Sequence, residues 1–259
     1  MTASVSTHGM KGACFSDEER EKMYAETLSY YITNLLPQNE NQRIVFAENS
    51  GWNMQRIIQK LPEYDKAKIE FISLQLEEFD ISKGKGYNEL LMINKAIEKS
   101  QFVKEAGAFF KVTGRYPIYN IGYFLKDASK RIYCDGIEFY CDIKDHKLYD
   151  WLRLGWCGHS FEARLWGVTT NFYNTHLAQL YKECDDYNDR LVEGVAFDFI
   201  KNNSIKNIAI RFKREPQFGG LEGSVIDAVS FSLDHNSFKS KLKIFVGNSI
   251  RVLIPWFKF

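Results

Sequence analysis

The chain has 259 residues, 45% of them hydrophobic, which is enough for one large α/β domain with a substantial core. Its 34 basic and 33 acidic residues leave a net charge of +1, so no global field favours nucleic acid. The odd number of cysteines, without C-x-x-C spacing, indicates free thiols in a reducing compartment rather than disulfides or a zinc site. They are Cys14, Cys134, Cys141, Cys157 and Cys184.

No targeting or membrane-spanning segment is expected. The first twenty residues lack the apolar stretch of a signal peptide, and no run of about 18 apolar residues occurs anywhere. We therefore expect a soluble, cytoplasmic protein.

The first half of the chain predicts alternating helices and strands. Ser16 and Glu19 form a capping-box pattern that predicts a helix over 16–36, ending near Pro37. Such alternation predicts parallel β–α units, with ligands bound at the carboxyl ends of the strands. The further elements are a strand at 43–48, a helix at 53–61, a strand at 68–75, a helix at 86–100 and a strand at 107–115.

The second half is less regular. Residues 130–145 predict two short strands about Asp135-Gly136, 170–202 predict two helices, and 205–224 predict a strand followed by a glycine-rich loop. No internal repeat or low-complexity linker separates the halves. We expect a single domain over 1–259, with a mixed sheet flanked by helices and an elaborated C-terminal half.

Three polar stretches follow or precede these elements, and the first is "ENSGW" at 48–52. Glu48 or Asn49 would hydrogen-bond a base or ribose. Ser50 and Gly51 would bring backbone amide groups close to the ligand. An ordinary turn is the competing interpretation.

The second stretch is "KGKGYNE" at 83–89, directly before a predicted helix. Helix N-termini favour anions, Lys83 and Lys85 add positive charge, and Gly84 and Gly86 permit close approach. A lysine-decorated helix entry is the alternative.

The third stretch, "KVTGRY" at 111–116, ends a predicted strand. Lys111 and Arg115 suit diphosphate oxygens, with Thr113 and Gly114 between them. A surface ion pair would explain the arginine equally well. None of the three stretches matches a Walker loop or G-x-G-x-x-G, and no G-x-S-x-G elbow supports hydrolase chemistry.

Four segments together resemble bacterial glycosyltransferases of capsular polysaccharide or lipopolysaccharide synthesis, which have a GT-A-like fold. The resemblance spans roughly 43–225 and implies a hexosyltransferase with a nucleotide-sugar donor. It also implies a saccharide or lipid-linked saccharide acceptor at the inner face of the plasma membrane. The segments are "KGKGYNELLMINKAIEKS", "FFKVTGRYPIYNI", "ARLWGVTTNFY" and "GGLEGS".

The sequence departs from this family at its metal motif. Thr113-Gly114-Arg115 stands where many GT-A enzymes carry D-x-D, and D-x-D is absent from the whole chain. We therefore expect weak or no dependence on Mg²⁺ or Mn²⁺, with lysine and arginine neutralising the leaving diphosphate. The closest acidic runs are at 142–145 and 183–189, and the second, between predicted helices, is expected to be solvated. The five histidines lack metal-ligand spacing.

Inverting transfer requires a carboxylate that takes the proton of the acceptor hydroxyl. Glu193, at the start of a predicted helix, lies where the resemblance implies such a base. Glu162 and Glu89 are further candidates, and positioning of the donor sugar is the alternative role for Glu89. A retaining mechanism needs no such base, and the sequence leaves the stereochemistry open.

Three further side chains are candidates for the acceptor or a closing loop. Trp166 would stack on a sugar ring beside Arg164, although a place in the core is the alternative. Arg214, in the loop over 214–224, would contact phosphate.

The tail over 238–259 contains five cations, no acid, and interleaved aromatic and aliphatic residues. This composition suits the surface of an anionic bilayer, and helix packing against the body is the competing interpretation.

Two other functions stay open at this stage. One is a nucleotide-dependent phosphotransferase or nucleotidyltransferase, which would require a metal. The other is a non-catalytic module that binds a sugar or nucleotide.

Overall fold

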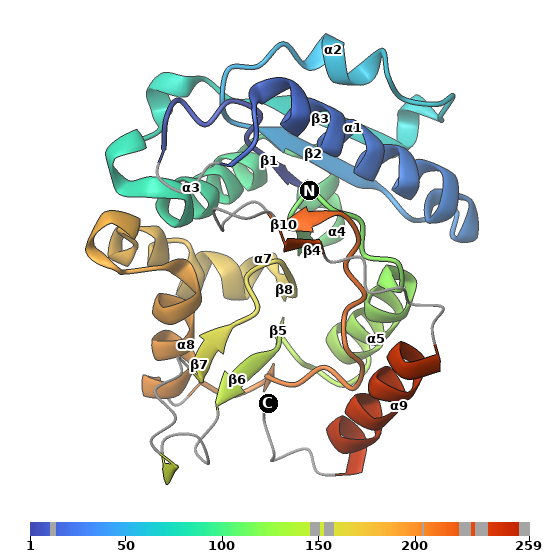
Figure 1. Ribbon diagram of the computed structural model, residues 1–259, viewed down its shortest axis with the longest axis vertical. Helices are drawn as coiled ribbons and strands as arrows, with labels where there is room; N and C mark the ends of the chain where they lie inside the picture. Colours follow the sequence, from blue (N-terminus) through green and yellow to red (C-terminus); the bar gives the residue numbers. More distant parts are fainter. Residues whose placement is uncertain are drawn as a thin grey trace.

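The computed structural model describes residues 1–10, 14–145, 151–152, 158–203, 205–222, 229–230 and 238–253. These residues form a mixed β-sheet with helices packed against it (Figure 1). The predicted α/β class with an elaborated second half is confirmed. No helix among the described residues is both long and apolar enough to cross a membrane.

The first half of the sheet is parallel. Strand β1 (Thr2–Ala3) pairs with β2 (Ile44–Glu48), which pairs with β3 (Ile69–Ser73). On its other side, β1 meets the end of β4 (Ala108–Val112) through one bridge between Thr2 and Thr113. The strand over 43–48, predicted to be the first, is therefore the second, because the sequence analysis missed β1.

The second half adds one reversed strand. Strand β8 (Leu165–Thr169) is antiparallel to β4, β5 (Phe139–Tyr140) is antiparallel to β8, and β9 (Ile208–Ala209) is parallel to β5. A three-stranded sheet of order β3-β2-β1 and a four-stranded sheet of order β4-β8-β5-β9 thus meet at the bridge between Thr2 and Thr113. Two small antiparallel ribbons lie apart from these sheets, β6 (Ile143–Asp145) with β7 (His159–Phe161) and β10 (Leu221–Glu222) with β11 (Val229–Ser230).

The helices agree with most of the sequence-based expectations. The capping box of Ser16 and Glu19 is present at the start of α1. The strand expected from residue 130 is wrong, since 130–133 form the last turn of the amphipathic helix α5. The helices are α1 (Asp17–Asn34), α2 (Met54–Ile58), α3 (Gly84–Lys99), α4 (Gln101–Ala106), α5 (Ile121–Tyr133), α7 (Thr170–Phe172, continued by a π-helical turn over Tyr173–Leu177), α8 (Val192–Asn202) and α9 (Phe238–Leu253). Single 3₁₀ turns occur at Leu36–Gln38, Lys66–Lys68, Leu76–Glu78, Ile81–Lys83, Leu180–Glu183 and Asp186–Asn188.

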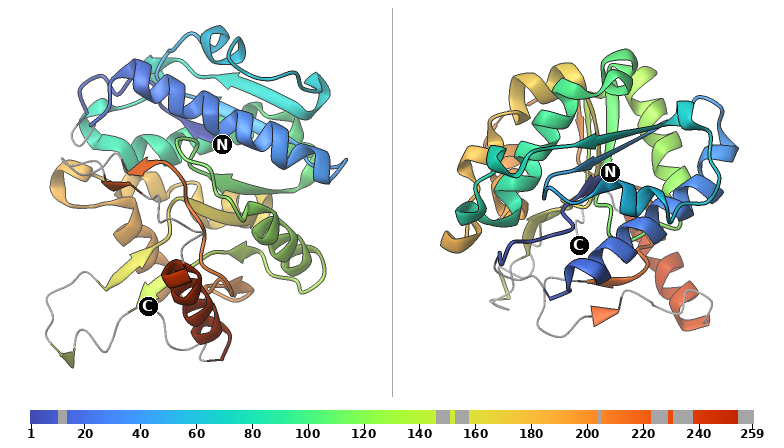
Figure 2. Two further views of the ribbon diagram at one scale, coloured as in Figure 1. Left: turned by 45° about the vertical axis from the view of Figure 1, so that its right-hand side comes forward. Right: turned by 90° about the horizontal axis from the view of Figure 1, so that it is seen from above.

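Strand β2 separates two layers of the core. Ile44 and Phe46 belong to the cluster that also contains the buried face of α1. Ala47 packs with Met92 of α3. Alternate residues of a strand point to opposite faces, so α1 and α3 cover opposite faces of this part of the sheet, as Figure 2 shows.

Candidate functional site at the carboxyl edge of the sheet

The topology selects one edge of the sheet as the place for a site. The chain runs from β1 outward to β2 and β3, and then returns to place β4 on the other side of β1. Ligands of open α/β sheets bind outside the carboxyl ends of the strands where the strand order reverses in this way. The segments that follow β1 and β4 therefore define the candidate site.

The segment after β1 is held by the residues that follow β2. The carboxylate of Glu48 is buried and accepts hydrogen bonds from the backbone N–H groups of Val5 (3.1 Å), Ser50 (2.9 Å) and Trp52 (3.2 Å). The N–H group of Ser6 donates to the Ser50 hydroxyl at 2.9 Å. This accounts for the acid and the serine of "ENSGW" as organisers of two adjacent loops.

Asn49 and Gly51 complete the same arrangement. The Asn49 side chain accepts from the Ser4 hydroxyl at 2.5 Å, and Gly51 adopts a positive φ of 72° that favours glycine. The described hydrogen bonds of residues 48–50 thus hold the loop after β1 in place. The contact of these residues with a nucleoside stays a prediction.

The N-terminus of α3 is capped by a carboxylate of the chain itself. Asp186 accepts from the backbone N–H groups of Lys85 at 2.7 Å and Gly86 at 3.2 Å. A Cβ atom on Gly84 would lie 2.5 Å from the Cβ of Asp186, and one on Gly86 would lie 3.0 Å from its carboxylate. The two glycines therefore admit Asp186, and this carboxylate takes the place predicted for a phosphate.

The side chain of Lys85 nevertheless belongs to a group of three cations. Burial and then the charges of Arg115 and Arg20 lower the pKa of Lys85. Arg20 is buried, its Nε donates to the carbonyl oxygens of Ser4 (3.0 Å) and Val5 (2.9 Å), and its pKa is lowered mainly by burial, with Arg115 adding to this. We call Arg20, Lys85 and Arg115 the cation cluster.

Arg115 is the member of the cation cluster with spare hydrogen-bonding capacity. Its Nη1 atom is buried and has no hydrogen-bond partner among the described residues. Its guanidinium lies 5.6 Å from the ring centre of Tyr116. The preceding Gly114 has no room for a side chain, because a Cβ there would lie 2.8 Å from the carbonyl oxygen of Thr2. Three mutually repelling cations with a spare buried donor suit an anion with several oxygens.

Lys111 does not belong to the cation cluster, and the prediction that it contacts a diphosphate is wrong. Its side chain is only 3% exposed, and its ammonium group binds the Glu89 carboxylate at 2.9 Å. The same group donates to the Thr113 hydroxyl at 2.9 Å and to the carbonyl oxygen of Ala163 at 2.6 Å. Lys111 therefore fixes Glu89 and Thr113 from inside the sheet.

Two glutamates, Glu89 and Glu162, influence the ionisation of a third, Glu193. Lys111, a hydrogen bond from Thr2 and the charge of Arg115 lower the pKa of Glu89 against the effect of its burial. Arg164 binds Glu162 through two hydrogen bonds, at 2.6 and 2.5 Å, and lowers the pKa of that carboxyl in the same way. Both are ionised partners of fixed cations.

Glu193 differs from the other two carboxyls. It lies in the first turn of α8, and none of the described ion pairs involves it. The surrounding protein, followed by the negative charges of Glu89, Glu162 and Asp186, raises the pKa of Glu193. Glu193 is nevertheless exposed to solvent. The pKa values of Glu89 and Glu162 are lowered, which suits fixed charges, whereas the pKa of Glu193 is raised, which suits a proton acceptor.

Two predicted site residues lie elsewhere. Trp166 is 3% exposed and stacks on Tyr173 in the core, so the prediction that it stacks on a sugar is wrong. The guanidinium of Arg214 lies 4.3 Å from the ring centre of Tyr123 on α5. Arg164, in contrast, lies at the site because it binds Glu162. Its guanidinium also lies 4.0 Å from the ring centre of Phe218 in the loop after β9.

Two parts of the site were missed from the sequence. The loop Ser4–Met10 follows a two-residue strand without an apolar run. Arg20 lies within the acidic first turn of α1 and carries no motif. The only available signal was the position of Arg20 one turn into a capped helix.

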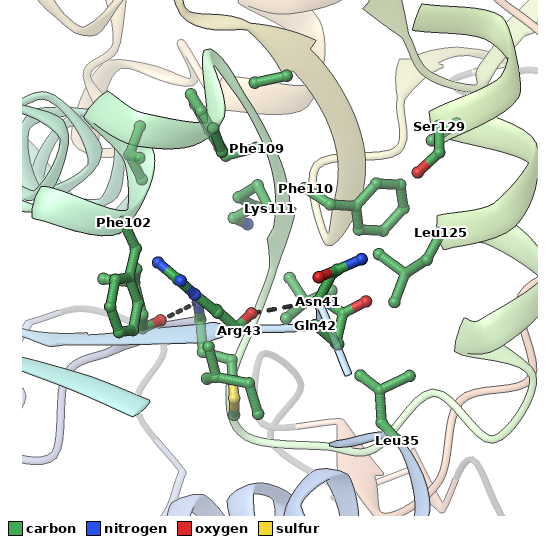
Figure 3. Close-up of a pocket in the computed structure, with 18 of the residues that line it drawn as sticks. Leu35, Asn41, Gln42, Arg43, Phe102, Phe109, Phe110, Lys111, Leu125 and Ser129 are labelled. Atoms are coloured by element: carbon green, nitrogen blue, oxygen red, sulfur yellow. Dashed lines mark hydrogen bonds between the residues drawn. The ribbon is translucent and has the colours of Figure 1, made fainter. Parts of the chain in front are cut away.

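A cavity with a volume of about 650 Å³ lies between β2 and β4 (Figure 3), and its lining includes Thr2 and Lys111, the two residues that hold Glu89. Arg43, which pairs with Glu105 at 2.7 Å and lies 4.8 Å from the ring centre of Phe102, stands on one side, and Leu125 of α5 lies on the other. Arg115, Lys85 and Glu193 are not among the residues that line this cavity.

Within the described part of the chain, no group of three or more His, Cys, Asp or Glu side chains is arranged to hold a metal ion. His159 is bound to Asp145 at 3.1 Å, and His146 and His235 lie outside the described residues.

No protein-family model matches the chain, and a search of curated proteins found no match. Among solved structures, the chain is similar to core-mannan synthase A from Aspergillus fumigatus, whose crystal structure is an Mn/GDP form. The identity is 11% and the TM-score 0.43, over 85% of this chain and 73% of that chain. A likeness of this strength does not bear on activity, which is inferred below from the residues of this chain.

Proposed function

We propose that this protein is a glycosyltransferase that moves a sugar from a nucleotide-sugar donor to a saccharide or lipid-linked saccharide acceptor. The observation that carries the proposal is the Arg115 guanidinium, whose buried Nη1 has no hydrogen-bond partner among the described residues, together with the carboxylates of Glu89 and Glu162, which Lys111 and Arg164 hold in place. Such a site can neutralise a leaving diphosphate and accept a proton beside it. A mixed sheet with helices on both faces agrees with the GT-A-like fold that the motif resemblance implies.

Each charged group then has a role. Arg115 and Lys85, with Arg20 behind them, bind the diphosphate oxygens. Glu193 accepts the proton of the acceptor hydroxyl as that oxygen bonds to the anomeric carbon, and the bond from this carbon to the diphosphate breaks. Glu89, held by Lys111, orients the donor sugar, while the loop after β1 and Glu48–Gly51 border the nucleoside.

The proposed diphosphate partners are side-chain cations rather than a metal held by D-x-D. Thr113-Gly114-Arg115 stands at the end of β4, and Arg115 supplies positive charge there. We therefore propose weak or no dependence on divalent metal. The biological setting, bacterial surface polysaccharide synthesis at the inner face of the plasma membrane, rests on the motif resemblance.

The first experiment is a thermal-shift panel of UDP, GDP, CMP and TDP sugars, with and without Mn²⁺. Wild type is compared with Arg115→Ala and with the matched control Arg43→Ala, whose arginine lines the cavity between β2 and β4. We expect one nucleotide class to stabilise wild type and Arg43→Ala but not Arg115→Ala.

Absence of stabilisation by every nucleotide sugar would refute the proposal. Binding without donor hydrolysis or transfer to any acceptor would identify a binding module instead. Phosphate or nucleotide transfer that strictly requires a metal would identify the phosphotransferase or nucleotidyltransferase alternative.

A further inference from the structure

The C-terminal helix α9 is fixed to the body by one face. Arg251 is 7% exposed, and its Nη1 donates to the Asp142 carboxylate at 2.9 Å and to the carbonyl oxygen of Phe212 at 3.2 Å. The side-chain oxygen of Asn248 accepts from the backbone N–H of Glu215 at 2.9 Å. The interpretation of this segment as a packed helix is thus correct for its inner face, and these contacts set which face points outward.

The outer face of α9 is an exposed apolar stripe. Its members recur three or four residues apart, or a multiple of a turn apart, so they share one side of the helix, opposite Arg251. Figure 1 shows α9 at the periphery of the molecule, away from the sheet. The stripe consists of Leu242 (51% exposed), Phe245 (69%), Val246 (47%), Val252 (57%) and Leu253 (73%).

The one polar side chain within the stripe is already satisfied. The hydroxyl of Ser249 donates to the carbonyl oxygen of Phe245 at 2.8 Å. A serine bonded back to its own helix can enter an apolar medium without an unpaired donor. The stripe can therefore be buried as a whole.

The charge of the helix is of one sign. Residues 238–253 contain four cations and no acid, and Lys241 is exposed at the border of the stripe. An amphipathic helix with an apolar face and cationic borders lies in the plane of a membrane surface and binds best to anionic lipids.

We propose that the outer stripe of α9 docks the protein on an anionic lipid bilayer, with the helix parallel to the surface. A second copy of the chain fits less well, because two-fold packing of this stripe would bring the lysine borders of both copies together. The inference does not depend on the proposed chemistry at the carboxyl edge.

The test is flotation of the full-length protein with vesicles of phosphatidylcholine, alone or mixed with phosphatidylglycerol. We expect binding to the anionic vesicles only, weakened by salt. The variant Phe245→Glu should lower the bound fraction at least about tenfold, since it puts a negative charge into the apolar face. Lys241→Gln should weaken binding to a smaller extent.

The matched control is Tyr133→Glu, an aromatic residue of similar exposure (66%) at the end of α5. It should bind vesicles as wild type does. The proposal is overturned if wild type binds no vesicles, or if Phe245→Glu binds as well as wild type. A concentration-dependent dimer that Phe245→Glu dissolves, without vesicle binding, would assign the stripe to a second copy and also overturn it. Nucleotide-sugar binding is measured separately, so neither result decides the other.

Discussion

At the residue scale, desolvation by the surrounding protein is the first cause of the raised pKa of Glu193, and the charges of its neighbours are the second. Glu89 and Glu162 keep their negative charges because Lys111 and Arg164 compensate them locally. These two charges then disfavour a third charge nearby. The fixed ion pairs therefore contribute to the site by setting the proton affinity of Glu193.

The first prediction concerns Glu193→Gln. Loss of a general base should lower the turnover of transfer by about 100-fold or more, with donor binding retained. Because the folded pKa is raised, the cost of ionising Glu193 grows as the pH rises from the unfolded pKa and is complete above the folded pKa. Thermal unfolding should therefore show the variant more stable than wild type at pH 8, and this gain should vanish near pH 4, where both are uncharged. A variant with full activity would contradict the assignment.

The second prediction separates Lys111 from Arg115. Lys111→Met leaves the Glu89 charge without its buried partner and should lower the free energy of unfolding by about 3–5 kcal/mol. The double variant Lys111→Met/Glu89→Gln should recover much of this loss in urea denaturation. Arg115→Ala should change stability by less than about 1 kcal/mol while abolishing nucleotide-sugar stabilisation. Equal stability losses for Lys111→Met and Arg115→Ala would show that both cations are structural.

At the element scale, α3 depends on a residue from a distant segment. Its first turn has no acid of its own, and Asp186, about 100 residues later, supplies the cap. The glycines of "KGKG" allow this approach, and the N–H group of Gly86 donates to the carboxylate of Asp186.

The third prediction follows from this cap. Asp186→Ala should lower the free energy of unfolding by about 1 kcal/mol, the usual effect of losing a helix cap. It should also lower the pKa of Glu193, since one of the charges that raises that pKa is removed, and the acid limb of the pH–rate profile should move to lower pH. The matched control Asp198→Ala, an exposed acid within α8, should do neither. An unchanged acid limb would remove Asp186 from the surroundings of Glu193.

Elements with a local signal could be predicted, and those formed by distant contacts could not. The capping box gave α1, and compact apolar runs gave β2, β3 and β4, because propensity and periodicity act within a few residues. Strand β1 has two residues, and its place is set by pairing with Ala47, Glu48 and Thr113. Nothing within its own sequence reports those partners.

At the scale of the whole molecule, the candidate site was predicted in part. The sequence placed Lys85, Arg115 and Glu193 at element ends, and the charge of Asp186 acts on the pKa of both Lys85 and Glu193. The sequence did not show that Lys111 forms an ion pair with Glu89 or that Trp166 lies in the core. Whether a charged or aromatic side chain points to solvent or to a partner depends on segments far away in the chain.

The last prediction concerns how α9 is joined to the rest of the molecule. Arg251 reaches Asp142, a buried carboxyl whose pKa is raised mainly by burial, with Arg251 and then Arg211 opposing this. Replacing Arg251 by Met removes a hydrogen bond to a charged group and should lower the free energy of unfolding by about 2 kcal/mol at pH 7. Without Arg251, the pKa of Asp142 rises further, so the loss should be largest above that pKa and fade as the pH falls through it and the carboxyl takes up a proton.

Hydrogen exchange should show faster exchange in 238–253 than in α3, because the inner face of α9 loses its anchor. Lys241→Met, on the outer side of the same helix, is the control and should leave both stability and exchange unchanged. If α9 exchanges at the wild-type rate in Arg251→Met, other contacts hold the helix, and the orientation of its outer stripe does not depend on Asp142.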